Sequence, residues 1–193
     1  MTEAGRPTKR DAILAAAVEC FAERGFHGTA VPEIAKRARV STGTLYHYFS
    51  SKEELVNSLY RGWKQQVWDR VYAVFDPDAG AEAQFSKALR VITQMAVENP
   101  AMANFVELHN HAAYLDDESL ALDKRLRDLA QSGVVSGQSA GILRDGNPVV
   151  LMEAVFGAFA GVIRAHLEGR IVVDDRLTDY LEGVLWSIIA KDS

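Results

Sequence analysis

The stretch Thr29–Lys52, TAVPEIAKRARVSTGTLYHYFSSK, decides the fold of this chain. Its first half predicts a short helix, because Ile34, Ala35 and Ala38 recur on one face at helical spacing. Thr29 is a residue type that caps helix N-termini, and we expect it to begin this helix. The pattern therefore indicates a compact helical unit rather than a strand.

A second short helix follows the turn. Ser41 is its expected N-cap, and Leu45 and Phe49, one turn apart, face the first helix. The opposite face carries small and hydrogen-bonding side chains, which suit a helix that approaches base edges in a major groove. Tyr48 has a competing structural interpretation, because it lies near the edge of the core face. The residues predicted to contact bases or phosphates are Thr29, Ser41, Thr42, Gly43, Thr44, Tyr46, His47, Tyr48 and Lys52.

This segment resembles the DNA-binding part of the TetR family of bacterial transcriptional repressors. The matching positions are Gly25-Phe26, Thr29, Ile34-Ala35, Ala38, Val40-Ser41, Gly43-Thr44-Leu45-Tyr46, Tyr48-Phe49, Lys52-Glu53 and Leu55. The resemblance implies an all-α protein of about nine helices. Residues 1–51 would form a three-helix helix-turn-helix domain, and residues 52–193 a helical domain for ligand binding and dimerisation.

Arg39 departs from the family pattern, which usually has glycine at this position of the turn. If the backbone is left-handed there, a residue with a Cβ costs roughly 1–2 kcal/mol relative to glycine. Three interpretations follow: the turn is altered, the arginine is retained for a phosphate contact, or it is a tolerated surface substitution.

The charge of the chain is divided by position. Residues 1–52 hold eight Lys or Arg against five Asp or Glu, whereas residues 53–193 hold thirteen against twenty-one. DNA binding needs positive charge on the docking face alone, so the net charge of −5 does not exclude a nucleic-acid partner.

Other features favour a cytoplasmic protein without a membrane span. The N-terminus has no signal-peptide pattern, and the most apolar stretch, 154–163, is half as long as the roughly 20 residues a span needs. A single cysteine, Cys20, cannot form an internal disulfide and is interpreted as a core residue.

The remainder of the chain predicts further helices, and no segment alternates at period two for long enough to form a sheet. A helix from Lys52 to about Phe75 links the two parts. The others are expected over 81–97, from Pro100 to about Tyr114, over 119–135, 149–167 and 174–190.

The helix at 149–167 is apolar on nearly every side and must be buried almost all round. We predict that it forms a four-helix bundle with the last helix and their symmetry mates in a homodimer. The predicted interface residues are Gly157, Gly161, Leu177, Leu181, Val184, Leu185 and Ile188.

Aromatic and sulfur-bearing residues spread over several helices are compatible with an apolar ligand cavity, although in any single helix they are more often plain core. As the family resemblance implies, such a pocket lies among the middle helices, and ligand entry shifts the fourth helix. The predicted pocket residues are Trp63, Met102, Phe105, His109, Phe156 and Phe159.

Two chemical alternatives are rejected. Gly137-Gln138-Ser139-Ala140-Gly141 matches the G-x-S-x-G of serine hydrolases, but helical periodicity precedes it, where that motif requires a strand-to-helix turn. Glu107, His109 and His111 could hold a metal, yet without a cysteine or a second cluster they are more often a polar face or isolated hydrogen-bonding residues of a pocket. We expect no enzyme activity, cofactor or metal.

The sequence therefore predicts a ligand-responsive repressor that binds a near-palindromic operator as a homodimer and is released by a small apolar effector. The alternative is a constitutive DNA-binding module whose helical body binds protein partners. A thermal-shift screen of apolar compounds distinguishes the two, because a ligand of the folded state raises its melting temperature.

Overall fold

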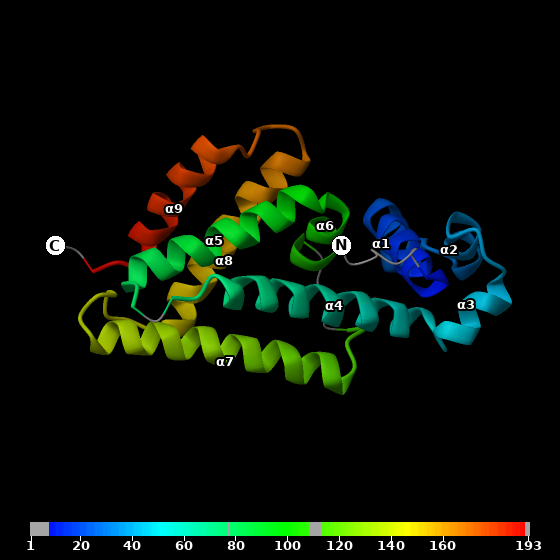
Figure 1. The fold of residues 1–193 in the computed structure, drawn as a ribbon, viewed down its shortest axis with the longest axis horizontal. Coiled ribbons are helices and arrows are strands. Elements are labelled where there is room, and N and C mark those ends of the chain that lie inside the picture. The colour runs from blue at the N-terminus through cyan, green and yellow to red at the C-terminus, as the bar shows by residue number, and fades with distance from the viewer. Residues whose placement is uncertain (1–7, 77, 109–112, 192–193) are drawn as a thin grey trace, which may run out of the picture.

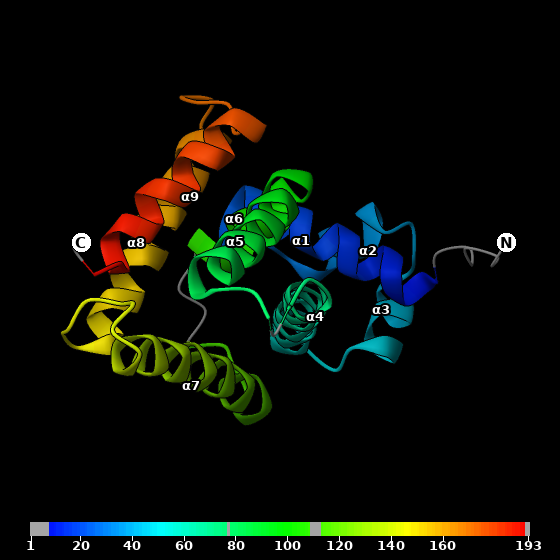
Figure 2. The same cartoon turned by 60° about the vertical axis from the view of Figure 1, so that its left-hand side comes forward.

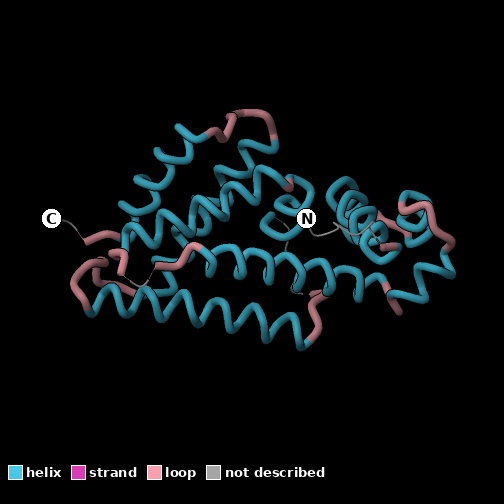
Figure 3. Tube along the Cα trace, in the orientation of Figure 1, coloured by secondary structure: helices cyan, strands magenta, loops and turns pink. Residues whose placement is uncertain are grey.

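The computed structural model describes residues 8–76, 78–108 and 113–191, and within these ranges it contains nine α-helices and no β-strand (Figure 3). The predicted all-α fold is thus confirmed. In chain order the helices are α1 (Lys9–Gly28), α2 (Val31–Arg37), α3 (Thr42–Tyr48), α4 (Lys52–Ala73), α5 (Ala81–Glu98), α6 (Pro100–Leu108), α7 (Asp117–Ser139), α8 (Pro148–Leu167) and α9 (Asp175–Ile189).

Helices α1, α2 and α3 form a head at one end of the molecule, and α3 is its outermost element in Figure 1. The head has its own hydrophobic core, in which apolar residues of all three helices are fully buried. They include Ile13 and Phe21 of α1, Ile34 of α2, Leu45 of α3, and Phe49 directly after it. The inward-facing residues predicted from helical spacing, Ile34, Ala35, Leu45 and Phe49, are confirmed as core.

Helix α4 connects the head to the body, where it runs beside α7 and beneath α5 (Figures 1 and 2). The core of the head continues along it without a break. Val56, Leu59 and Trp63 of α4 belong to the same buried cluster as Phe21, whose ring stacks on Phe105 of α6 at a centroid distance of 5.6 Å. Head and body are therefore packed against each other rather than joined by a free linker.

The connection before α7, which includes Tyr114 and Asp116, also packs against the head. The Tyr114 ring stacks on Phe26 at 4.1 Å, and its hydroxyl lies 2.7 Å from His27 Nε2. The buried Asn57 amide of α4 donates to the Tyr114 carbonyl at 2.8 Å and accepts from the backbone N–H of Asp116 at 2.9 Å. This buried amide network fixes α4 against the connection before α7.

The body consists of α5, α6, α8 and α9 around a second apolar cluster, with α7 on the outside. Two predicted boundaries differ. Helix α7 continues through residues 136–139, one turn beyond the predicted end. Helix α6 is described as far as Leu108, and Tyr114, where we expected that helix to end, is not helical. Residues 113 and 114 form a turn, and residues 109–112 lie outside the described residues.

Helix α8 is less buried than its composition predicted. Among the described residues it is the one helix long and apolar enough to cross a membrane by length and composition, with 22% of that window buried in the monomer. A buried core helix passes the same test. Several of its apolar side chains, including Val149, Val150 and Phe156, are exposed in the single chain.

Candidate DNA-binding surface and ligand cavity

The turn between α2 and α3 has the geometry of a Schellman motif. The backbone N–H of Val40 donates to the Ala35 carbonyl at 3.0 Å, and that of Arg39 donates to the Lys36 carbonyl at 3.1 Å. In this motif the residue after the C-cap is left-handed and is usually glycine. Arg39 occupies that position with φ 57°, the one positive φ of a non-glycine residue in the described ranges. The turn is thus unaltered, and the arginine adopts it at a conformational cost.

Helix α3 begins as predicted. The Ser41 hydroxyl accepts from the backbone N–H of Thr44 at 3.0 Å and lies 2.8 Å from the Thr44 hydroxyl. Because the cap satisfies an otherwise open N–H, this seven-residue helix has a defined start even though it is too short to be stable alone.

The outer face of α3 presents the predicted reading residues. Gly43, Tyr46 and His47 are exposed, with Tyr46 at 51% and Tyr48 at 38%, and Thr42 and Thr44 are half-buried. The His47 and Tyr48 rings make an edge-to-face contact at 5.4 Å, which restrains both side chains. The surface therefore combines a glycine, hydroxyls and two phenol rings, which can approach base edges and phosphates.

Thr29 is not available to DNA, contrary to the prediction. It is 2% exposed, and its hydroxyl points back to α1, where it donates to the carbonyls of Gly25 at 2.8 Å and Cys20 at 3.0 Å. The N-cap of α2 is Ala30 instead. Gly25, at φ 69°, breaks the α-helical path of α1, and Thr29 satisfies the carbonyls that this break leaves open.

Lys52 is also committed within the protein. Its ammonium donates to the carbonyls of Phe26 at 2.7 Å and Thr29 at 3.0 Å, and it lies 4.1 Å from the centroid of the Phe26 ring. A cation at the C-terminal end of a helix is favourable. Lys52 thus connects the start of α4 to the end of α1 by hydrogen bonds. This arrangement does not support the predicted phosphate contact.

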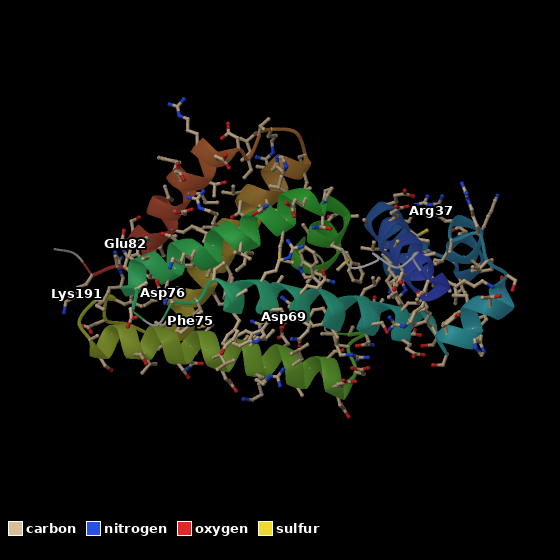
Figure 4. The ribbon with its side chains drawn as sticks, in the orientation of Figure 1. Arg37, Asp69, Phe75, Asp76, Glu82 and Lys191 are labelled. Carbon is tan, nitrogen blue, oxygen red and sulfur yellow. The ribbon has the colours of Figure 1, made fainter. Side chains whose placement is uncertain are left out.

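The other cations of the head divide into paired and unpaired groups. Arg37, labelled in Figure 4, makes two hydrogen bonds to Glu23 of α1, at 2.7 and 2.9 Å. These bonds hold the pKa of the Glu23 carboxyl below its ordinary value. Arg10 lies over the Phe49 ring at 5.3 Å. Lys36 and Arg39 are exposed, and no ion pair joins either of them to another described residue. Lys9 at the start of α1 is exposed in the same way, so Lys9, Lys36 and Arg39 are placed where a phosphate can meet them.

The body contains an apolar cavity of about 340 Å³ between α4, α5, α7, α8 and α9. Phe156 and Phe159, both predicted, lie in its wall. The described residues that line it are Lys64, Val67, Phe85, Ala88, Leu89, Ile92, Ala130, Val134, Met152, Val155, Phe156, Phe159 and Ile189. Its volume falls in the range of pockets that take small molecules.

Three other predicted pocket residues lie elsewhere. Trp63 and Met102 line a separate, smaller cavity of about 220 Å³ between α1, α4 and α6, and Phe105 is buried against Phe21 in the head-side core. Large aromatic residues are equally suited to core and cavity walls, so residue type misled the prediction. His109 lies outside the described residues.

Sequence reasoning missed most of the wall. Ala88, Ala130 and Val134 are small aliphatic residues of the kind that fills any helix interface, and nothing in their sequence context marks a cavity. A weak signal existed on α7, where Ala130 and Val134 are four residues apart on one face. The cavity results from five helices that leave space between them.

An apolar strip along α8 and α9 is exposed on the monomer, and the two helices lie side by side (Figure 2). Gly157 and Gly161 of α8 are exposed with open space above each Cα. On α9, Val184 is 39% exposed, and Leu177 and Ile188 are half-buried. These five predicted interface residues can reach a second molecule.

Leu181 and Leu185 are the exceptions, because both point into the body. Leu181 is 4% and Leu185 0% exposed, and both belong to the cluster with Phe159 and Ile163. The apolar stripe of α9 is broad enough to cover two faces, and the sequence did not show which face turns inward. Their assignment to the interface was wrong.

The structure bears on the serine-hydrolase motif and on Cys20, but not on the metal hypothesis. Ser139 is the last residue of α7, and its hydroxyl donates to the Val135 carbonyl at 2.9 Å, so it is not on a strand-to-helix turn. Gly137 is required for packing, since a Cβ there would lie 2.7 Å from the Leu143 side chain. Cys20 is buried as predicted, and burial raises the pKa of its thiol. His109 and His111 lie outside the described residues, so the metal hypothesis stays untested.

A capped, exposed helix carried by a second short helix across a Schellman turn defines a helix-turn-helix DNA-binding protein. Comparison with family models agrees. The model of bacterial regulatory proteins of the tetR family matches residues 13–59, and that of tetracyclin repressor-like C-terminal domains matches residues 62–191. The chain belongs to the TetR family of transcriptional regulators.

Individual relatives support the same family. The chain is 32% identical over 143 residues to the HTH-type transcriptional regulator UidR of Escherichia coli, covering 70% of this chain and 72% of UidR. It is 40% identical over 72 residues to the HTH-type transcriptional repressor KstR2 of Mycobacterium tuberculosis. That second match covers 37% of this chain and 36% of KstR2, so it spans about a third of that relative. A crystal structure of a TetR family transcription regulator from Marinobacter aquaeolei VT8 superposes with a TM-score of 0.82 at 25% identity, over 95% of this chain and 96% of that one.

Proposed function

We propose that this chain is a ligand-responsive repressor that acts in the cytoplasm, binds a near-palindromic operator as a homodimer, and leaves the operator when a small apolar effector binds. Residues 1–51 would read DNA and residues 52–193 would sense and dimerise. The observation that carries the proposal is that the wall of the 340 Å³ cavity includes α4, the helix that begins where the head ends.

The connection between cavity and head is direct. Val67 of α4 lines the cavity, and four turns earlier Lys52 of the same helix binds the carbonyls of Phe26 and Thr29 at the end of α1. A ligand can shift the protein between two arrangements only if it interacts differently with them. A guest that displaces α4 would do so and would move the head with it.

The dimer is supported by the exposed strip on α8 and α9. Gly161 of α8 and Val184 of α9 lie on this strip, where the two-fold partner would cover apolar surface. In such a dimer each subunit carries one head, so a change in the separation of the heads would misalign them with two successive major grooves.

The test uses DNA and compounds in sequence. Selection from a random duplex pool should yield two half-sites related by a two-fold axis, about 34 Å or a multiple of it apart. A library of apolar compounds is then screened for loss of fluorescence anisotropy on the selected duplex. A releasing compound should weaken DNA binding by the factor by which DNA weakens the compound, typically about 5 to 150-fold. Selection of no consensus would overturn the DNA-reading part.

One observation favours the alternative of a constitutive module with protein partners. Trp68 and Tyr72, in the half of α4 remote from the head, form an exposed stack with Phe75, which follows the helix and is labelled in Figure 4. The ring distances are 6.3 and 6.5 Å. Tyr72 is 68% exposed, and exposed aromatic residues are typical of protein interfaces. The constitutive-module alternative replaces the ligand-responsive repressor if two results are obtained: no compound releases the protein from DNA, and Tyr72→Ser abolishes its effect on transcription in cells.

A further inference from the structure

The smaller cavity, of about 220 Å³, lies where the head meets the body, because α1, α4 and α6 pack against one another there. Leu14 and Val18 of α1 line it from the head, and Trp63 of α4 and Met102 of α6 line it from the body. None of the described residues in its wall also lines the 340 Å³ cavity. A guest in the smaller cavity would therefore contact both parts of the protein at once.

The wall of this cavity is neutral and partly polar. None of the described residues that line it is charged, while Ser58, Gln66 and Asn99 add a hydroxyl and two amides to its apolar residues. A charged guest would lose its hydration here without meeting a group of opposite charge. The wall therefore favours an uncharged guest.

Trp63 brings an unsatisfied hydrogen-bond donor to this wall. The residue is 4% exposed, and its buried indole N–H has no hydrogen-bond partner among the described residues, whereas a buried tryptophan usually has one. The N–H is covered by neighbouring atoms, so a guest reaches it when a side chain of the wall moves. Met102 is half-buried in the same wall, and its unbranched side chain can adapt to a guest. A hydrogen-bond acceptor on the guest would then satisfy the indole.

Gly62 leaves space beside the cavity on its α4 side. Glycine is unfavourable in the interior of a helix, and Gly62 stands in the middle of the 22-residue α4. No packed neighbour in the described chain lies within 4 Å of the position that a Cβ would take, so close packing does not require the glycine. A larger side chain at this position would take up part of the space that a guest needs.

The volume limits the guest to a small molecule. An apolar cavity of about 150 Å³ takes benzene, which has six non-hydrogen atoms. By proportion, 220 Å³ corresponds to a guest of about nine non-hydrogen atoms. A phenyl ring with one short substituent that carries a carbonyl group has this size.

We propose that this cavity is a second binding site, for a neutral molecule of about nine non-hydrogen atoms that combines an apolar ring with one hydrogen-bond acceptor for the Trp63 indole. The site goes beyond the proposed function, because its occupation requires neither DNA nor the effector of the larger cavity. A guest that contacts head and body together would bind best to the arrangement described here and would oppose movement between them.

The experiment compares three compounds of equal size: acetophenone, which has a carbonyl acceptor, cumene, which has none, and benzoate, which is charged. Binding to the full-length protein is followed by the proton–nitrogen correlation signal of the Trp63 indole, which is assigned by its loss in Trp63→Phe. Acetophenone should move this signal downfield, as a new hydrogen bond does, and should bind about 2 to 13-fold more tightly than cumene. Benzoate should bind more weakly than both, because its charge has no partner in the wall.

Two glycine variants locate the site. Gly62→Leu adds a side chain beside the cavity and favours the helical conformation of α4, so the folded protein should no longer bind acetophenone. Gly133→Leu is the matched control, since Gly133 is an exposed glycine of α7 with open space at its Cβ position and lies outside the wall. Its binding of acetophenone should equal that of wild type.

Two further variants test the donor and the choice of cavity. Trp63→Phe keeps a ring and removes the N–H, so in ligand-observed titrations acetophenone affinity should fall to that of cumene while cumene affinity is unchanged. Ala130→Trp adds a large side chain to the wall of the 340 Å³ cavity and should leave the response of the Trp63 signal to acetophenone unchanged.

Each outcome bears on a different part of the proposal. If cumene binds as tightly as acetophenone and the Trp63 signal does not move, the indole is not a ligand donor and the predicted class of guest is wrong. If Gly62→Leu binds acetophenone as wild type does, the cavity at the head is not a site. If Ala130→Trp abolishes binding and Gly62→Leu does not, acetophenone occupies the larger cavity, a result that overturns the second site and leaves the proposed function intact.

Discussion

Replacing Arg39 by glycine should make this protein more stable and, by our interpretation, a weaker DNA binder. Arg39 is held at φ 57° by the Schellman bonds around it, and its side chain is exposed. A left-handed residue with a Cβ costs about 1–2 kcal/mol. Strain of this kind at an exposed cation raises the hypothesis that the cation is needed, here for a phosphate of the operator.

The magnitude follows from two opposing effects. Glycine removes the Cβ strain of about 1–2 kcal/mol but makes the unfolded chain more flexible, which costs about 0.4–1 kcal/mol. We therefore expect Arg39→Gly to raise the free energy of unfolding by about 0.5–1 kcal/mol, or Tm by about 1–4 °C for a chain of this size. Arg39→Ala keeps the Cβ and removes the cation, so its stability should stay within about 0.5 kcal/mol of wild type.

The assays are urea unfolding for stability and anisotropy titration of a selected duplex over a range of salt concentrations. Both variants should bind DNA more weakly, and the slope of log K against log salt should decrease by about one in each, since one phosphate contact is lost. If Arg39→Gly is no more stable than Arg39→Ala, the backbone at this position is not strained. If DNA binding is unchanged in both, Arg39 is a tolerated surface substitution.

Three further predictions concern the reading helix, the dimer and the response to acid. Tyr46→Ala should weaken the selected duplex more than random DNA, and an equal loss on both would remove Tyr46 from base reading. Val184→Glu should give a folded monomer in sedimentation equilibrium with unchanged circular dichroism, because Val184 is exposed on the monomer. Leu185→Glu places a charge in the core and should unfold the protein instead. A fully dimeric Val184→Glu protein would place the interface elsewhere. Desolvation by burial raises the pKa of Asp123, but hydrogen bonds from Tyr60 and Arg127 outweigh it and hold the pKa below its ordinary value. The ionised Asp123 carboxylate therefore stabilises the folded state above about pH 4, and this contribution to the free energy of unfolding is lost as the pH falls below it. Asp123→Asn should therefore flatten the loss of urea stability between about pH 4 and 2, and an unchanged acid profile would contradict this role.

Most of the DNA-reading head could be predicted from the sequence because its determinants are local. The Ser41 cap acts three residues away, and Leu45 and Phe49 are one turn apart, so spacing along the chain indicates their positions in space. The anomaly at Arg39 was also visible in the sequence as an arginine where the family usually has glycine, but the sequence left open whether the turn is altered. The structure adds that the Schellman bonds form regardless.

Prediction failed where a side chain had to choose between distant partners. Thr29 has the right type for a helix cap, yet the break at Gly25 supplies carbonyls that its hydroxyl binds instead. Lys52 has the right type for a phosphate, yet the carbonyl of Phe26, 26 residues away, lies within reach of its ammonium. The residue type limits which kinds of partner a side chain can bind, and the tertiary structure determines which of them lies within hydrogen-bonding distance.

What the sequence by itself determined is the set of helices and the Ser41 cap, because helix formation and capping depend on contacts three or four residues apart. What the tertiary structure alone decided is which apolar faces meet. Leu185 is in the core and Val184 is at the surface, although they are neighbours on one broad apolar stripe. The cavity, too, exists only where five helices fail to close on one another, and Lys64 became its one charged wall residue among those described through packing that no local pattern records.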